Sequence, residues 1–195
     1  MTNYTPTKAN KIALERIENA ARTKATELDL SYLNINNLST EIGKLVNLTS
    51  LNLSKNQLTA LPIGIGKLVN LVSLDLANNE LTSIPEEIGR LINLKYLDCS
   101  RNKLERLPME IGRLGNLVWL TLVQNQLSSL PTEIGGLIKL KSLDLSNNNL
   151  NNLPIGIQGI KNLRYLSLAN NPLPISPEVL IKIEEPQAIL DYYFS

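Results

Sequence analysis

The sequence contains no histidine, and this absence narrows the chemistry open to the chain. Histidine is the side chain that most often serves as general base and metal ligand, so Ser/His/Asp and Cys/His nucleophile systems are excluded. The single cysteine, Cys99, excludes an internal disulfide and cannot form a zinc site without other ligands. We therefore expect a protein that is not an enzyme and that holds no metal and no cofactor.

Long apolar runs, strong net charge and aromatic residues are also scarce. No run approaches about 18 apolar residues, and the N-terminal stretch MTNYTPTKANK lacks the apolar segment of a secretory signal. These features predict a cytoplasmic location and no membrane partner. The 19 basic and 18 acidic residues are mixed along the chain, which argues against a nucleic-acid partner. Because aromatic residues make up only 4%, leucine and isoleucine must fill the core.

The sequence does have a repeat of 23 residues, which aligns leucines with leucines from Ala25 to about Leu180. One unit cannot enclose its own apolar side chains, because a single coil is open above and below. A period of this length therefore predicts a solenoid of stacked coils. The units begin at Ala25, Leu48, Leu71, Leu94, Leu117, Leu140 and Leu163.

The unit at 71–93 contains two different patterns of apolar and polar residues. Alternation around Leu74 and Leu76 predicts a short strand that turns Ser73 and Asp75 outward. Pro85 followed by EEIG predicts one tight helical turn with the proline near its first position. In the fourth unit Cys99 replaces the inward leucine, which favours a buried small hydrophobe over a reactive thiol.

The ninth position of the unit is asparagine in every copy except the first, which has Leu33. An amide can both donate to and accept from backbone groups that face inward where a strand becomes a loop. At strand spacing, about 4.8 Å, these side chains are expected to form a structural hydrogen-bonded ladder. The members are Asn56, Asn79, Asn102, Asn125, Asn148 and Asn171.

The two ends depart from the repeat. Thr5 and Pro6 resemble the start of a helix, whose predicted apolar stripe is Ile12, Ala13, Ile17, Ala20 and Ala21. Such a helix would cover the open first coil, although it could instead bind a partner. At the far end a second cap is predicted, with Pro186 starting a new helix and an aromatic end that could alternatively dock something downstream.

We divide the chain into an N-terminal helical cap (1–24), seven repeats, the last partial (25–176), and a C-terminal helical cap (177–195), within one domain. The apolar residues of the second cap are Val179, Leu180, Ile183, Ile189, Leu190, Tyr193 and Phe194.

The stretch LKYLDCSRNKLERLPMEIGRLGNL at 94–117 resembles a leucine-rich repeat. That resemblance implies an α/β fold: a curved solenoid with a parallel sheet on the concave face and short 3-10 or helical turns on the convex face. It also implies protein binding on the concave sheet. The flanks ALERIENAARTKATELDLS, NPLPISPEVL and PQAILDYY look like the segments that bracket the repeats of prokaryotic Roco proteins. This second resemblance implies a regulatory, signalling module with an attached or associated GTPase domain.

Nucleotide chemistry cannot reside in this chain itself. The stretch at 64–67, GIGK, mimics the end of a phosphate loop, but Leu61 stands where the first glycine is required and Leu68 where Ser or Thr would hold magnesium. It is repeat consensus. The column Asp29, Asp75, Asp98 and Asp144 could bind cations, but a solvated polar face is the preferred interpretation, with Lys95 and Arg101 close enough to compensate the neighbouring Asp75 and Asp98.

The third position of each unit, on the concave face, carries the candidate site. Most copies have small or acidic residues there, but Tyr96 and Trp119 occupy adjacent strands and should touch. Exposed aromatics beside an arginine are typical of binding hot spots, whereas the structural alternative is an unused face that these residues merely cover. The predicted protein-binding residues are Tyr96, Asp98, Arg101, Trp119, Val123 and Tyr165.

Three functions follow from these observations. The first is non-enzymatic recognition of a protein or peptide on the concave face. The second is the regulatory repeat region of a Roco-type GTPase, acting through intramolecular or dimer contacts. The third is a structural role in which the solenoid self-associates through its ends.

Overall fold

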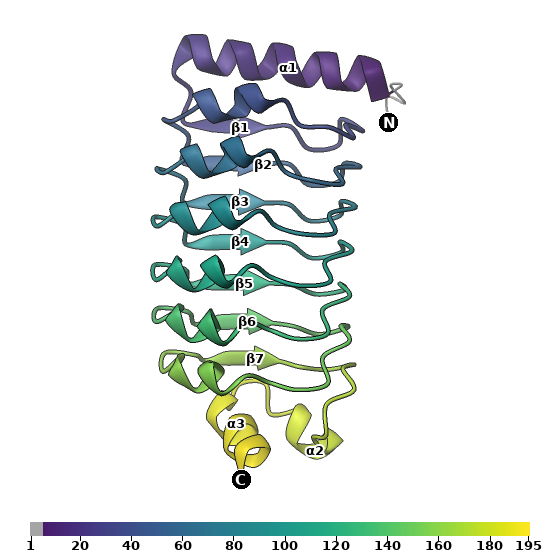
Figure 1. The fold of residues 1–195 in the computed structure, drawn as a ribbon, viewed down its shortest axis with the longest axis vertical. Coiled ribbons are helices and arrows are strands. Elements are labelled where there is room, and N and C mark those ends of the chain that lie inside the picture. The colour runs from purple at the N-terminus through teal and green to yellow at the C-terminus, as the bar shows by residue number, and fades with distance from the viewer. Residues whose placement is uncertain (1–5) are drawn as a thin grey trace.

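The computed structural model describes residues 6–195, and these form one continuous stack of coils between terminal helices (Figure 1). Helix α1 (Pro6–Thr23) lies across one end, and helices α2 (Pro177–Leu180) and α3 (Pro186–Phe194) lie at the other. The predicted helix start at Thr5 lies outside the described residues. The strands are β1 (Glu27–Asp29), β2 (Ser50–Asn52), β3 (Ser73–Asp75), β4 (Tyr96–Asp98), β5 (Trp119–Thr121), β6 (Ser142–Asp144) and β7 (Tyr165–Ser167).

The seven strands form one parallel sheet in chain order. Each residue pairs with the residue 23 positions later, so that Ser73 pairs with Tyr96 and Tyr96 pairs with Trp119. Between consecutive strands the chain makes a 3-10 turn on the opposite side of the coil. The expected α/β solenoid with a parallel sheet and helices at both ends is confirmed. The turns are η1 (Thr40–Lys44), η2 (Ile63–Lys67), η3 (Glu86–Arg90), η4 (Met109–Arg113), η5 (Thr132–Gly136) and η6 (Ile155–Gly159).

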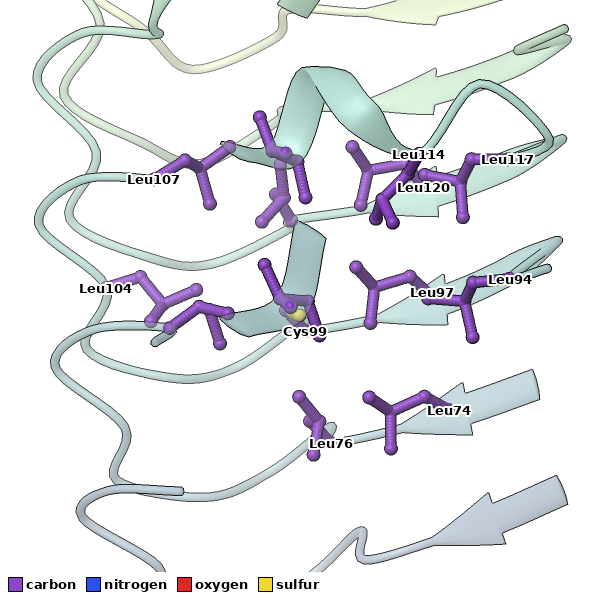
Figure 2. Close-up of a cluster of buried hydrophobic side chains, with 14 of the residues drawn as sticks. Leu74, Leu76, Leu94, Leu97, Cys99, Leu104, Leu107, Leu114, Leu117 and Leu120 are labelled. Atoms are coloured by element: carbon purple, nitrogen blue, oxygen red, sulfur yellow. The ribbon is translucent and has the colours of Figure 1, made fainter. Parts of the chain in front are cut away.

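Inward-facing leucines and isoleucines fill the space between sheet and turns. Cys99 is 1% exposed, and Figure 2 shows its sulfur in the same cluster as Leu76, Leu97 and Leu104. Burial raises the pKa of the Cys99 thiol far above its usual value, with smaller contributions from the nearby carboxylates Asp98 and Asp75. The thiol therefore stays protonated and behaves as the buried apolar residue that the repeat pattern predicts.

The turns stack closely, because glycine occupies the positions at which successive turns meet. A Cβ added at Gly112 would lie 2.1 Å from the carbonyl oxygen of Glu133 in the next turn. Pro85 lies immediately before its helical turn, with φ −66° and ψ 149°, and the turn starts at Glu86. An extended proline ends the preceding loop and fixes where the turn begins.

Both ends of the sheet are covered by helix and backbone contacts. On α1 the buried residues are Ala9, Ala13, Ile17 and Ala20, whereas Ala21, predicted in the stripe, is exposed. The stripe therefore lies on the expected face, with Ile12 partly buried, but it starts at Ala9 and ends at Ala20. The guanidinium of Arg16 donates to the carbonyl oxygen of Asp29 on β1 at 3.1 Å.

At the C-terminal end, the segment after α2 continues the hydrogen bonding of the last strand. Leu166 of β7 donates its N–H to the carbonyl oxygen of Ile183 at 2.8 Å. The hydroxyl oxygen of Tyr193 on α3 accepts the N–H of Leu153 at 2.9 Å. Ile189 and Leu190 are buried against the last coils. The open strand edge is thus occupied by the chain itself. No helix in residues 6–195 has the length and hydrophobicity needed to cross a membrane.

Candidate functional site

Each strand has three residues, of which the middle leucine points into the core and the outer two lie on the opposite face of the sheet. Of these outer residues Thr121 and Ser167 are buried, and the others are at least partly exposed. On β4 the outer residues are Tyr96 and Asp98, and on β5 they are Trp119 and Thr121. Tyr96 is 47% exposed and Trp119 is 38% exposed. Large aromatic side chains therefore lie open on the outer surface of the sheet, which we call the sheet face.

A groove of about 600 Å³ lies at the carboxyl ends of the strands on the sheet face. It brings together four predicted site residues, Asp98, Arg101, Trp119 and Val123, and adds Asp75 from the neighbouring strand. Carboxylates, an indole ring and a guanidinium thus surround one space. The other lining residues are Tyr32, Asn52, Ser54, Lys55, Ala77, Asn78, Ser100, Thr121 and Gln124.

The remaining two predicted site residues lie outside this groove. Tyr96 pairs in register with Trp119, but the predicted contact between the two rings is absent: among residues 6–195 the aromatic rings in contact are those of Tyr193 and Phe194. Tyr165 lies on β7, where its hydroxyl donates to Oδ2 of Asp144 at 3.4 Å. Burial, and then the charge of Asp144, raise the pKa of the Tyr165 hydroxyl.

Two carboxylates on adjacent strands face the groove. Asp75 and Asp98 pair in register, and each accepts a hydrogen bond from the N–H two residues ahead, from Ala77 at 2.9 Å and from Ser100 at 2.8 Å. The pKa of Asp75 is raised, first by burial and then by the negative charge of Asp98. The Ala77 N–H, the Ser54 hydroxyl and Lys55 act in the opposite direction on that pKa.

The cations around the groove differ from those expected. Lys95 is not among the residues that line this groove. It lines a second groove, at the starts of the strands. The cation whose charge acts on Asp75 is Lys55, whose ammonium lies 4.3 Å from the centre of the Tyr32 ring and donates to its hydroxyl. Arg101 donates through Nε to Oε1 of Gln124 at 2.9 Å.

Sequence reasoning missed Tyr32 and Lys55, which form the N-terminal end of the groove. They share the eighth position of the unit with Arg101 and Gln124, and all four have φ between 54° and 56°. This left-handed conformation, uncommon for residues other than glycine, follows each strand and aligns the side chains along one rim. The recurrence of one position just after each strand was the available signal, but the residue types there differ.

The asparagine column binds coils together through the backbone. Asn102 donates through Nδ2 to the carbonyl oxygens of Cys99, in its own coil, and of Leu76, in the preceding coil, both at 3.0 Å. Its Oδ1 accepts the N–H of Leu81 in the preceding coil at 3.0 Å. The asparagine side chains of the column therefore hydrogen-bond to backbone groups and not to one another. Equivalent bonds are made by Asn56, Asn79, Asn125, Asn148 and Asn171.

A second asparagine column, which sequence reasoning missed, runs along the surface before the strands. Asn93 donates through Nδ2 to the carbonyl oxygen of Val69 at 2.9 Å, one coil back. Asn70, Asn116 and Asn162 make the same bond. Its sequence signal is the asparagine that precedes the first leucine of most units.

Within residues 6–195 no group of three or more Cys, Asp or Glu side chains lies close enough to hold a metal ion. The acidic column is interrupted by Asn52 and Thr121. Each of its carboxylates accepts a hydrogen bond from the backbone N–H two residues ahead, in the turn that follows its own strand. On the turn side, Lys44 forms an ion pair with Glu41, three residues before it. The sheet face therefore offers an aromatic and charged surface suited to recognition.

Stacked parallel coils, backbone-bridging asparagines and an exposed sheet define a repeat solenoid of the binding-module class. The sequence matches the leucine rich repeat family over residues 69–127 and 115–173, with a further repeat match at 47–68. The chain belongs to the leucine-rich repeat family, whose members are generally non-enzymatic modules for protein-protein interaction. No curated protein matches it.

Several solved structures are similar to this chain. A leucine-rich repeat protein of Leptospira interrogans is 37% identical with a TM-score of 0.69, over 88% of this chain and 49% of that protein. The PEPR1–AtPEP1 structure is 30% identical with a TM-score of 0.69, over 76% of this chain and 22% of that one. The plant peptide hormone receptor RGFR1 in complex with RGF2 is 35% identical with a TM-score of 0.66, over 76% and 25%. The chain thus spans about half of these proteins' lengths or less.

Proposed function

We propose that this chain recognises a protein or peptide partner on the sheet face. The observation that carries the proposal is the position of Trp119, the single tryptophan of the chain, which is 38% exposed in a groove beside Asp98 and Arg101. Tryptophan, tyrosine and arginine are the residues that most often dominate binding energy. The proposed binding residues are Tyr96, Asp98, Arg101, Trp119, Val123 and Tyr165.

Two further features support this function. Tyr96, Asp98 and Trp119 lie on β4 and β5, which are hydrogen-bonded to neighbouring strands on both sides, so little conformational entropy is lost at these residues when a partner binds. Among the similar structures, RGFR1 is a plant peptide hormone receptor in complex with RGF2, and the similarity covers 76% of this chain.

The test compares partner capture by the wild type and by a Tyr96→Ala/Trp119→Ala variant from the native cell lysate. We expect the variant to lose the bound partner, because the two aromatic side chains supply most of the exposed apolar surface on β4 and β5. Tyr192→Ala is the control, since Tyr192 is also 47% exposed but lies on α3. Equal retention of every partner by both variants would remove the proposal.

The second candidate function is the regulatory repeat region of a Roco-type GTPase in the cytoplasm. It is supported by the flanks that resemble those of Roco repeats, which include α1 and α3. The test is the DNA downstream of the codon for Ser195: an open frame that continues into a GxxxxGK[ST] motif is expected. A stop codon directly after that position would exclude an attached GTPase domain.

A further inference from the structure

The two neighbouring carboxylates of the groove are not required by the fold. The same strand position in the second coil is Asn52, whose Oδ1 accepts the N–H of Ser54 at 2.9 Å. Asp75 accepts the equivalent N–H of Ala77 at the same distance. A neutral acceptor at this position therefore serves the turn as a carboxylate does, and the fold needs no negative charge there. The charges of Asp75 and Asp98 need another explanation.

The charge of Asp75 is also unfavourable in the protein on its own. Burial and the neighbouring Asp98 raise the pKa of Asp75, which means that its ionised form is disfavoured. The nearby cations do not form ion pairs with it: Lys55 is directed at Tyr32 and Arg101 at Gln124. The ion pairs of Lys44 with Glu41 and of Lys103 with Glu80 both lie away from this groove.

Besides the carboxylates of Asp75 and Asp98, the groove is lined by the indole ring of Trp119. Trp119 lies on β5, diagonally across from Asp98 on β4. Diagonal neighbours on one face of a sheet are within reach of long side chains. A guanidinium can donate two hydrogen bonds to a carboxylate and also stack on an indole, whereas an ammonium is a compact charge without a stacking plane.

We propose that the groove binds one arginine side chain of the partner, with its guanidinium between Asp75 and Asp98 and against the Trp119 ring. This inference rests on the proposed function and names the chemistry of its partner. The rim cations Lys55 and Arg101 repel further positive charges, and Val123 offers an apolar wall. The partner is therefore a segment with a single arginine beside apolar residues rather than a polybasic one.

The test begins with a random dodecapeptide phage library selected on the full chain. The enriched peptides are then synthesised with arginine, lysine or citrulline, the neutral isostere of arginine, at the position of the enriched arginine. Affinity is measured by the fluorescence of Trp119, which is the chain's single tryptophan. The site variant is Asp75→Asn/Asp98→Asn. The control is Glu27→Gln/Asp29→Asn, which removes two charges from exposed positions of β1.

Enrichment of peptides with one arginine is expected. Citrulline should weaken binding about tenfold or more for the wild type and the control, and lysine should weaken it less, while the site variant should bind arginine and citrulline peptides alike. Enriched peptides without arginine that still depend on Trp119, or an equal effect of citrulline on the site variant, would overturn this inference and leave the proposed function standing. Failure to enrich any peptide would count against both.

Discussion

Among single residues, the inward asparagines connect one coil to the next. Asn102 satisfies three carbonyl oxygens and one N–H, and two of these four groups belong to the preceding coil. In Asn102→Ala the carbonyl oxygens of Leu76 and Cys99 and the N–H of Leu81 would lose this partner, whereas the Ser100 carbonyl oxygen would still accept the N–H of Asn78. We therefore expect the free energy of unfolding to fall by about 1 to 3 kcal/mol. Chemical denaturation measures this. The control is Asn149→Ala at an exposed position, and an equal midpoint for both variants would contradict the role of the column.

A pH-dependent prediction follows from Asp75. Its pKa is raised above the usual 3.8 in the folded state, so the folded state binds this proton more tightly than the unfolded chain does. The stability that Asp75 contributes is therefore complete below pH 3.8 and is lost as the pH rises through the folded-state pKa.

Asp75→Asn keeps the acceptor for Ala77 and removes the charge, as Asn52 does naturally. We expect the variant to melt at a higher temperature than the wild type at pH 7 and at the same temperature in acid. Thermal unfolding across this pH range measures the difference, with Asp29→Asn as the control at an exposed carboxylate. A variant that is less stable at pH 7 would show that the charge of Asp75 is stabilising.

The sequence alone predicted residues whose environment recurs in every coil. The asparagine column and the buried Cys99 belong to this group, since position in the repeat determines which backbone groups or side chains surround them. Tyr32 and Lys55 could not be predicted as a pair. Their proximity depends on a positive φ after each strand, which sequence pattern does not reveal when the residue there is tyrosine, lysine, arginine or glutamine.

At the scale of secondary-structure elements, the stacking of the 3-10 turns sets how closely the coils approach. In Gly112→Ala the new Cβ would lie 2.1 Å from the carbonyl oxygen of Glu133, so η4 and η5 must separate. We expect a loss of about 1 to 3 kcal/mol in unfolding free energy, measured by denaturation. Gly115→Ala is the matched control, because its nearest atom would be 3.8 Å away. Equal destabilisation by the two changes would rule out close turn packing as the cause.

Element types were predictable from the sequence, but their exact limits were not. The alternation around Leu74 and the proline before each turn indicated a strand and a helical turn, which the structure contains. The buried face of α1 was predicted except at its ends, where Ala9 is buried and Ala21 is exposed. Alanines lie on several sides of this helix, so only its docking angle on the first coil decides which of them are covered.

For the whole molecule, we propose that residues 177–195 act as a cap within one domain. Removal of 186–195 would expose the apolar surface that Ile189 and Leu190 cover and would take away the acceptor for Leu153. We expect the shortened chain to melt at a lower temperature and to associate, because an open solenoid end presents apolar surface and strand edge. Light scattering and thermal unfolding measure both effects. If the two chains have the same mass and melting temperature, α3 is not a cap.

The overall architecture was predictable because a 23-residue period with inward leucines has one way to bury them. The groove was only partly predictable. Asp98, Arg101, Trp119 and Val123 could be grouped from their positions in adjacent units, and the structure places all four in it. Tyr96 does not line the groove. The shape of the groove depends on the directions of the side chains along its rim, which the repeat pattern does not specify.

The inward asparagines have a further consequence, for the number of coils. Each coil donates to and accepts from the one before it and offers the same groups to the one after it. A unit such as Leu71–Asn93 is therefore complete in its hydrogen bonds between any two neighbours, and nothing in the bonding sets the length of the stack. A second copy inserted after Asn93 should add one strand to the sheet without leaving a backbone group unpaired. This fold is thus extensible by whole units, and an unfolded or aggregated insertion variant would contradict that.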